Sequence, residues 1–123
     1  MNTSQITTHV LDATSGRPAA GVHVELFARE TADSAGAGAG AGEWRAVAAS
    51  VTDADGRVSR LGPDTVPAGE YRLRFDTGGY FAARGTDTFY PEVLIGFVVA
   101  EEGRHYHVPL LLSPFAYSTY RGS

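Results

Sequence analysis

The chain has 123 residues, 43% hydrophobic and 20% charged, which is enough for one hydrophobic core and ordinary for a soluble protein. Its net charge of −4 gives no electrostatic reason to bind nucleic acid or an anionic membrane. It has no Cys, and all 10 of its basic residues are Arg, which excludes thiolate chemistry, disulfides, cysteine-ligated metals and reactions that need a lysine amine.

The start of the chain and its longest apolar run predict a cytoplasmic protein. Met1–Gln5 has neither the basic nor the apolar region of a signal peptide. Val93–Ala100 is far too short to cross a bilayer. We therefore expect a single cytoplasmic domain over residues 1–123 with no nucleic-acid partner and no membrane partner.

Alternating or β-branched side chains predict eight short strands separated by turn-forming residues. These are Ile6–Asp12, Val22–Phe27, Trp44–Val51, Arg57–Leu61, Glu70–Phe75, Glu92–Ala100, Arg104–Leu112 and Phe115–Arg121. Gly78–Arg84 is the one predicted helix, about two turns long. This spacing is typical of an all-β sandwich.

Two segments between the strands have compositions that predict turns or loops. Asp53–Gly56 is a tight-turn signature. Ser34–Gly42 is a low-complexity Ala/Gly tract without side chains that can anchor a core. We expect the tract to be a flexible insertion in a hairpin that does not touch a functional site.

Histidines are the main candidates for chemistry. Alternation along Arg104–Leu112 places His105 and His107 on the face opposite the apolar side chains. Such a pair can bind a metal only with a third ligand, and the strand offers no Asp or Glu, so we expect no metal site. Two exposed histidines without a function are the simpler alternative. His9 shares the face of the first strand with Thr7 and Leu11, where a purely structural histidine is the simpler alternative.

The remaining motifs exclude familiar catalytic machinery. The chain has no G-x-S-x-G elbow and no glycine-rich phosphate loop between a strand and a helix. An enzyme built from these residues would have to activate water directly through histidine. Tyr120 and Arg121 lie in a tail predicted to remain strand-like, either as a polar edge strand or as a segment held against a site.

Several segments resemble the transthyretin-related 5-hydroxyisourate hydrolases. The matching segments are Thr8–Asp12, Gly16–Ala19, Thr52–Arg57, His105–Pro114 and the closing tetrapeptide Tyr120–Ser123. They span nearly the whole chain, and the last two are the most specific. The Ala/Gly tract departs from the family pattern and is similar to an insertion before the third strand.

The resemblance implies which residues form the site. The catalytic residues it implies are His9, Arg57, His107 and Ser123; the substrate-binding residues are His9, Arg57, Tyr120, Arg121 and Gly122. The two histidines are expected to position and deprotonate water, and Arg57 to orient the substrate and offset developing negative charge. Tyr120 is expected to stack on or hydrogen-bond the substrate, with Arg121 and Ser123 enclosing the site.

The resemblance also implies a fold, an assembly and a reaction. It implies a transthyretin-like sandwich of two four-stranded sheets, with the first, fourth, seventh and eighth strands in one sheet. It implies a homotetramer, a dimer of dimers, with its sites between the dimers. The implied reaction is the hydrolysis of 5-hydroxyisourate to 2-oxo-4-hydroxy-4-carboxy-5-ureidoimidazoline in urate degradation, without a metal or organic cofactor.

Two other functions remain open at this point. A transthyretin-like carrier would bind a small ligand without chemistry, and an interaction module would leave the histidine face in solvent. Neither needs His9, Arg57, His107 and the tetrapeptide together, and transthyretin lacks that combination. The residues therefore favour the enzyme.

Overall fold

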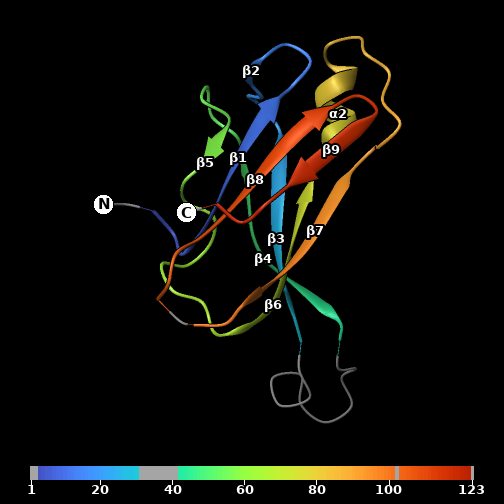
Figure 1. Cartoon of the computed structure of the whole chain (residues 1–123). Coiled ribbons are helices and arrows are strands. Elements are labelled where there is room, and N and C mark those ends of the chain that lie inside the picture. Colours follow the sequence, from blue (N-terminus) through green and yellow to red (C-terminus); the bar gives the residue numbers. More distant parts are fainter. Residues whose placement is uncertain (1–2, 31–41, 102, 123) are drawn as a thin grey trace.

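The computed structural model describes residues 3–30, 42–101 and 103–122, which form two facing β-sheets with one short helix (Figure 1). The strands are β1 (Ile6–Asp12), β2 (Arg17–Pro18), β3 (His23–Arg29), β4 (Trp44–Val51), β5 (Arg57–Val58), β6 (Gly69–Phe75), β7 (Val93–Val99), β8 (Tyr106–Ser113) and β9 (Ala116–Thr119), and the helix is α2 (Thr77–Ala82). This confirms the predicted all-β sandwich. Most of the predicted Ala/Gly insertion lies outside the described residues.

The first sheet brings together strands that are far apart in the sequence. Its order is β2-β1-β8-β9, and β5 also pairs with β1. β1 and β8 run parallel, with pairs from Ile6↔Tyr106 to Asp12↔Leu112, whereas the other pairings are antiparallel. The four strands expected here are present. The two-residue β2 is an addition, formed between the first two predicted strands.

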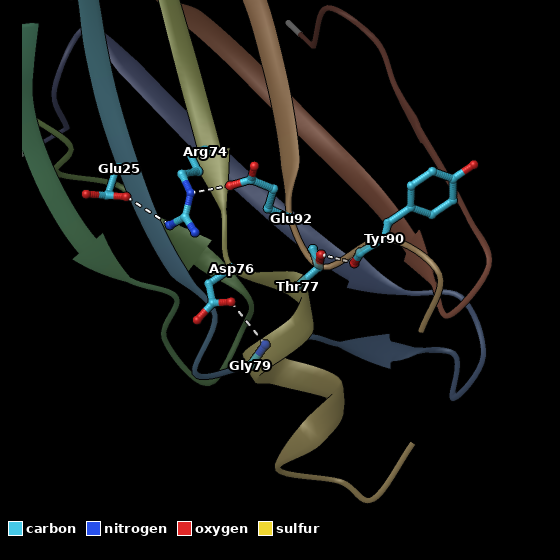
Figure 2. A network of polar contacts seen from close by, with 7 residues as sticks. All are labelled: Glu25, Arg74, Asp76, Thr77, Gly79, Tyr90 and Glu92. Atoms are coloured by element: carbon cyan, nitrogen blue, oxygen red, sulfur yellow. Dashed lines mark hydrogen bonds and ion pairs between the residues drawn. The ribbon is translucent and has the colours of Figure 1, made fainter. Parts of the chain in front are cut away.

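The second sheet is fully antiparallel, with the order β4-β3-β6-β7. On its outer face, Arg74 of β6 pairs with one carboxylate on β3 and with another next to β7 (Figure 2). Its Nη1 lies 3.0 Å from a carboxylate oxygen of Glu25, and its Nε lies 2.5 Å from one of Glu92, just before β7. All three side chains are partly solvent-exposed, so these ion pairs contribute little to stability.

The hydrophobic core lies between the sheets. Alternation sends one face of each central strand inward, as predicted for β8. Completely buried side chains come from both sheets and include Ile6, Val10, Val24, Leu26, Leu73, Phe75 and Leu110. The opposite face of β1 and β8 is therefore free to carry polar chemistry. No helix in the described ranges has the length and apolar character needed to cross a membrane.

The helix begins and ends at defined hydrogen bonds. A side-chain oxygen of Asp76 accepts a hydrogen bond from Gly79 N at its start (Figure 2). At its end, Gly85 adopts φ +65° while Gly85 N donates to Ala82 O and Thr86 N to Phe81 O, a Schellman arrangement. The regular helix thus covers residues 77–82, instead of the predicted 78–84, and its closing turn accounts for the earlier end.

Several predicted strand boundaries differ from the observed ones, and three of the differences have a specific cause in the hydrogen bonding of the backbone. The strand starting at Arg57 stops at Val58, and beyond it Leu61 N donates to the hydroxyl of Ser4. β8 begins at Tyr106, because Arg104 O accepts a hydrogen bond from the Gln5 side chain. β9 ends at residue 119, because its next partner would be the proline at 109, which has no N–H to donate.

A hydrogen bond from Tyr80 connects the helix to the end of β1. Its hydroxyl donates to Oδ2 of Asp12 over 2.8 Å in a buried contact, and the Asp12 side chain also accepts from Thr14 N. Burial, together with this carboxylate, raises the pKa of Tyr80 to about 12. The Arg84 guanidinium covers the Tyr80 ring at 3.7 Å.

We expect Tyr80→Phe to lower the free energy of unfolding by about 1–3 kcal/mol, because Asp12 loses a buried donor. Urea unfolding measures this change. Tyr90→Phe is the matched control, since within the described chain the Tyr90 hydroxyl makes no hydrogen bond while its ring packs on Phe89 and Tyr117. Equal stability of Tyr80→Phe and the control would contradict the assigned role.

Candidate active site

The strands that carry His9, Arg57 and His107 are neighbours in the first sheet, because β1 pairs with both β5 and β8. His9 and Arg57 are directly opposite in the antiparallel β1–β5 pair, where Cα atoms lie about 4.5–5.5 Å apart. His107 lies on β8, level with Thr7 and so two residues from His9 along β1. Thr7 and His9 share a face of β1, and the Thr7 side chain contacts His107. The three candidates thus meet on the face turned away from the core.

The imidazole of His107 is half-buried and fixed in place. Its Nδ1 lies 2.8 Å from the hydroxyl of Thr7, and the same hydroxyl lies 2.9 Å from Nε2 of His105. The two rings stack with centroids 6.1 Å apart. His105 precedes β8, yet its ring lies on the same side as His107, as the alternation predicted.

The surroundings of His107 favour its neutral form. Burial lowers the pKa of His107 below its usual value of 6.5, and the positive charges of His105, His9 and Arg57 lower it further. An imidazole is a base only when neutral, so this shift keeps a lone pair available at physiological pH.

The turn before β5 positions both His9 and Arg57. Oδ1 of Asp53 accepts hydrogen bonds from the backbone N–H groups of Asp55 and Arg57, each at 2.9 Å. Asp55 O lies 2.8 Å from Nε2 of His9. A carbonyl only accepts, so His9 donates from Nε2, and in the neutral ring Nδ1 keeps the lone pair.

Gly56 allows this turn to lie against β1. It adopts φ +76°, and a Cβ at this position would lie 2.3 Å from Val10 O. Its own carbonyl accepts a hydrogen bond from Val10 N at 2.7 Å. Only glycine permits so close an approach in this conformation, which explains the Asp-Gly step that the sequence marked as a turn.

The tail beyond β9 returns to His107. Gly122 N donates to His107 O over 2.8 Å, forming an isolated bridge. A Cβ on Gly122 would lie 2.6 Å from Cδ2 of His107, so the tail backbone is in contact with the imidazole. The Arg121 guanidinium covers the Tyr106 ring at 4.7 Å. Ser123, an expected catalytic residue, lies outside the described residues.

Two surface hollows adjoin His107. One of about 190 Å³ is lined by Thr3, Thr7, Thr8, Arg57, Val58, Ser59, His105 and His107. The other, of about 330 Å³, lies on the tail side and is lined by Ile95, Gly96, Phe97, Val98, Tyr106, His107, Val108, Thr119, Tyr120 and Arg121. His107 belongs to both, whereas His9 lines neither and lies beside Arg57. Arg57 thus lines the smaller hollow, Tyr120 and Arg121 line the larger one, and His107 is the residue common to both.

Two contacts of the site were not anticipated from the sequence. The sequence pattern places Thr7 only as a neighbour of His9 on the first strand, and it gives no indication of the Asp55 carbonyl. The parallel alignment of β1 with β8 places Thr7 beside His107, and short-range sequence patterns carry no signal for such a pairing. Among the described residues, no group of three or more His, Asp or Glu side chains is arranged to hold a metal ion.

The chain is similar to known proteins in both sequence and structure. The HIUase/Transthyretin family matches residues 6–122. The 5-hydroxyisourate hydrolase of Mus musculus is 43% identical over 121 residues, covering 98% of this chain and 96% of the mouse protein. The structure of Klebsiella pneumoniae 5-hydroxyisourate hydrolase aligns with a TM-score of 0.77 at 37% identity, over 96% of this chain and 98% of that one.

A transthyretin is similar in structure as well. The crystal structure of transthyretin from Sparus aurata aligns with a TM-score of 0.82 at 36% identity, over 96% of each chain. The fold is thus transthyretin-like, as predicted. Because hydrolase and transthyretin share it, the fold does not distinguish a catalyst from a carrier, and that distinction depends on the site residues.

Proposed function

Since the chain belongs to the HIUase/Transthyretin family, we propose that it is a 5-hydroxyisourate hydrolase of urate degradation. Its product is then 2-oxo-4-hydroxy-4-carboxy-5-ureidoimidazoline. The observation that carries the proposal is the meeting of His9, Arg57 and His107 on one polar face, from strands far apart in the sequence. A carrier of small ligands has no need of a neutral imidazole beside a guanidinium.

His107 is the general base of the proposed reaction. Water is a poor nucleophile, and removing its proton as it attacks requires a base that is neutral at the working pH. The lowered pKa of His107 meets that requirement. Thr7 occupies Nδ1, so Nε2 is the ring nitrogen that takes the proton. His9, with its Nδ1 lone pair, helps to position the water.

The bond changes follow from hydrolysis of a ring amide. The water oxygen bonds to the carbonyl carbon while a water proton passes to Nε2 of His107. The carbonyl oxygen gains a negative charge, which the Arg57 guanidinium offsets. The C–N bond then breaks, the carbonyl re-forms as part of a carboxyl group, and the imidazolium returns its proton to the leaving nitrogen.

The tail completes the proposed site. Arg121 is anchored on the Tyr106 ring and Gly122 on the backbone of His107, which holds residues 120–122 beside the base. Tyr120 and Arg121 line the larger hollow next to His107, where they can contact the substrate ring. We assign Tyr120, Arg121 and Gly122 to substrate binding.

We expect Gly122→Ala to lower kcat/KM roughly 10- to 100-fold, because a methyl group at this position overlaps Cδ2 of His107 and displaces either the tail or the base. Steady-state kinetics measures the loss, and thermal unfolding tests whether the fold is intact. A variant with wild-type kinetics would show that the tail need not lie against His107.

The function is tested by generating 5-hydroxyisourate from urate with urate oxidase and following its ultraviolet absorbance. The hydrolase accelerates the decay in proportion to protein concentration. The alternative function, a small-ligand carrier, is suggested by the similarity to the Sparus aurata transthyretin. Saturable binding with an unchanged decay rate would establish the carrier and refute the hydrolase.

We also propose that the protein is a homotetramer, a dimer of dimers. Large hydrophobic side chains remain exposed on and near the edge strands β7 and β9: Leu94 (44%), Val98 (61%), Phe115 (67%), Tyr117 (40%) and Phe89 (70%). Apolar side chains along sheet edges favour association with another copy. Light scattering should give four times the mass of one chain, and a monomer would refute the assembly.

The cytoplasmic location stays a prediction from the sequence.

A further inference from the structure

One hydroxyl joins two imidazoles at the edge of the site. Thr7 Oγ1 lies 2.8 Å from Nδ1 of His107 and 2.9 Å from Nε2 of His105. Thr7 is buried, with only 5% of its surface exposed, so water has little access to compete for these bonds. A hydroxyl carries one proton, so it can donate to only one of the two rings.

The two imidazole nitrogens are the hydrogen-bond partners of this buried hydroxyl, so its proton is satisfied only if Thr7 donates to one of them. When both histidines are neutral, two arrangements meet this requirement. In the first, Nδ1–H of His107 donates to Thr7, and Thr7 donates to Nε2 of His105. In the second, both bonds are reversed, and Nδ1 of His107 accepts. The first leaves the lone pair of His107 on Nε2, whereas the second puts a proton there and removes the base.

The surrounding charge favours the first arrangement. His107 lies beside Arg57, which lines the same hollow, and near His9. A lone pair on the free ring nitrogen is attracted by the guanidinium, whereas an N–H dipole there is repelled. His105 is exposed, so its Nδ1–H can be hydrated by solvent in this arrangement.

We propose that Thr7 is a positioning residue for the reaction, accepting a hydrogen bond from Nδ1–H of His107 and donating one to Nε2 of His105. The inference rests on the proposed function for its catalytic consequence. Thr7 fixes the tautomer and orientation of the base, as the third member of a catalytic triad does, although it is neutral. His105 sets the direction of the Thr7 hydroxyl by offering it an acceptor.

The hydrogen-bond arrangement can be measured without activity. In the full-length protein labelled with ¹⁵N, long-range proton–nitrogen correlations distinguish the two neutral tautomers of each histidine. At about pH 8, where an imidazole is neutral, we expect His107 to carry its proton on Nδ1 in the wild type and in Thr7→Ser. Thr7→Val, which keeps the shape but loses the hydroxyl, should populate the Nε2–H form. An Nε2–H tautomer in the wild type would overturn the proposal.

Kinetics of the same variants tests the consequence for the reaction. We expect Thr7→Val to lower kcat roughly 10- to 100-fold with KM changed less than about twofold, and Thr7→Ser to restore kcat to within about threefold. Thr77→Val is the matched control, since it removes a buried hydroxyl that donates to Tyr90 O instead (Figure 2). Equal kcat in the wild type and Thr7→Val would refute the role of Thr7.

The two measurements separate this inference from the proposed function. If the wild type has the expected tautomer but leaves the decay of 5-hydroxyisourate unchanged, the hydrolase assignment fails, and the catalytic role of Thr7 fails with it. If the protein hydrolyses 5-hydroxyisourate but Thr7→Val retains both tautomer and kcat, only the inference about Thr7 fails.

Discussion

His107→Gln should lower kcat/KM for 5-hydroxyisourate by about 100- to 10,000-fold while the protein remains folded. A glutamine side chain can hydrogen-bond to Thr7 but cannot take a proton from water. His107 is only half-buried, so the substitution removes little of the core. Absorbance decay of 5-hydroxyisourate measures the effect, and His23→Gln, on an exposed position at the start of β3, is the matched control.

The pH dependence of the wild type gives a second test of the same base. Because the pKa of His107 is lowered, the neutral base persists as the pH falls through 6.5, and activity is lost only below that value. The acid limb of kcat/KM should therefore lie below pH 6.5 in the wild type and disappear in His107→Gln. An acid limb above 6.5, or one unchanged in the variant, would assign the base to another group.

Arg57→Lys should lower kcat/KM by about 100- to 1,000-fold. Lysine keeps the charge but loses the planar fork that orients a ring substrate and meets the developing charge on its oxygen. The backbone N–H of residue 57 still donates to Asp53, so the turn is preserved. The control is Arg17→Lys in the exposed β2. Similar kinetics for both variants would remove Arg57 from the mechanism.

Local sequence patterns predicted the strands and their faces well because alternation reflects burial directly. Val22, Val24 and Leu26 are all fully buried, as their spacing predicted. The boundaries were less predictable, because they depend on partners that are distant in the sequence. The Ser4 hydroxyl accepts a hydrogen bond from Leu61 N, beyond the end of β5, and the Gln5 side chain donates to Arg104 O, just before β8. Such competition between side chain and backbone has no signature in the segment itself.

The candidate site was predicted by resemblance rather than by pattern. Strand alternation alone predicts only that His9, His105 and His107 lie on outward faces of their strands. Their meeting depends on the parallel pairing of β1 with β8, which joins residues about a hundred positions apart. The contact of Thr7 with both imidazoles depends on that same register, and it lies beyond what one-dimensional spacing conveys.

A crystal structure of the protein soaked with urate tests most directly whether His9, Arg57 and His107 contact the same bound molecule. Urate is a stable ring system similar in structure to the substrate. We expect a single urate within hydrogen-bonding distance of Arg57 and of Nε2 of His107, with His9 beside it. Urate bound only among Ile95, Phe97 and Tyr120, without contact to Arg57, would contradict the proposed site.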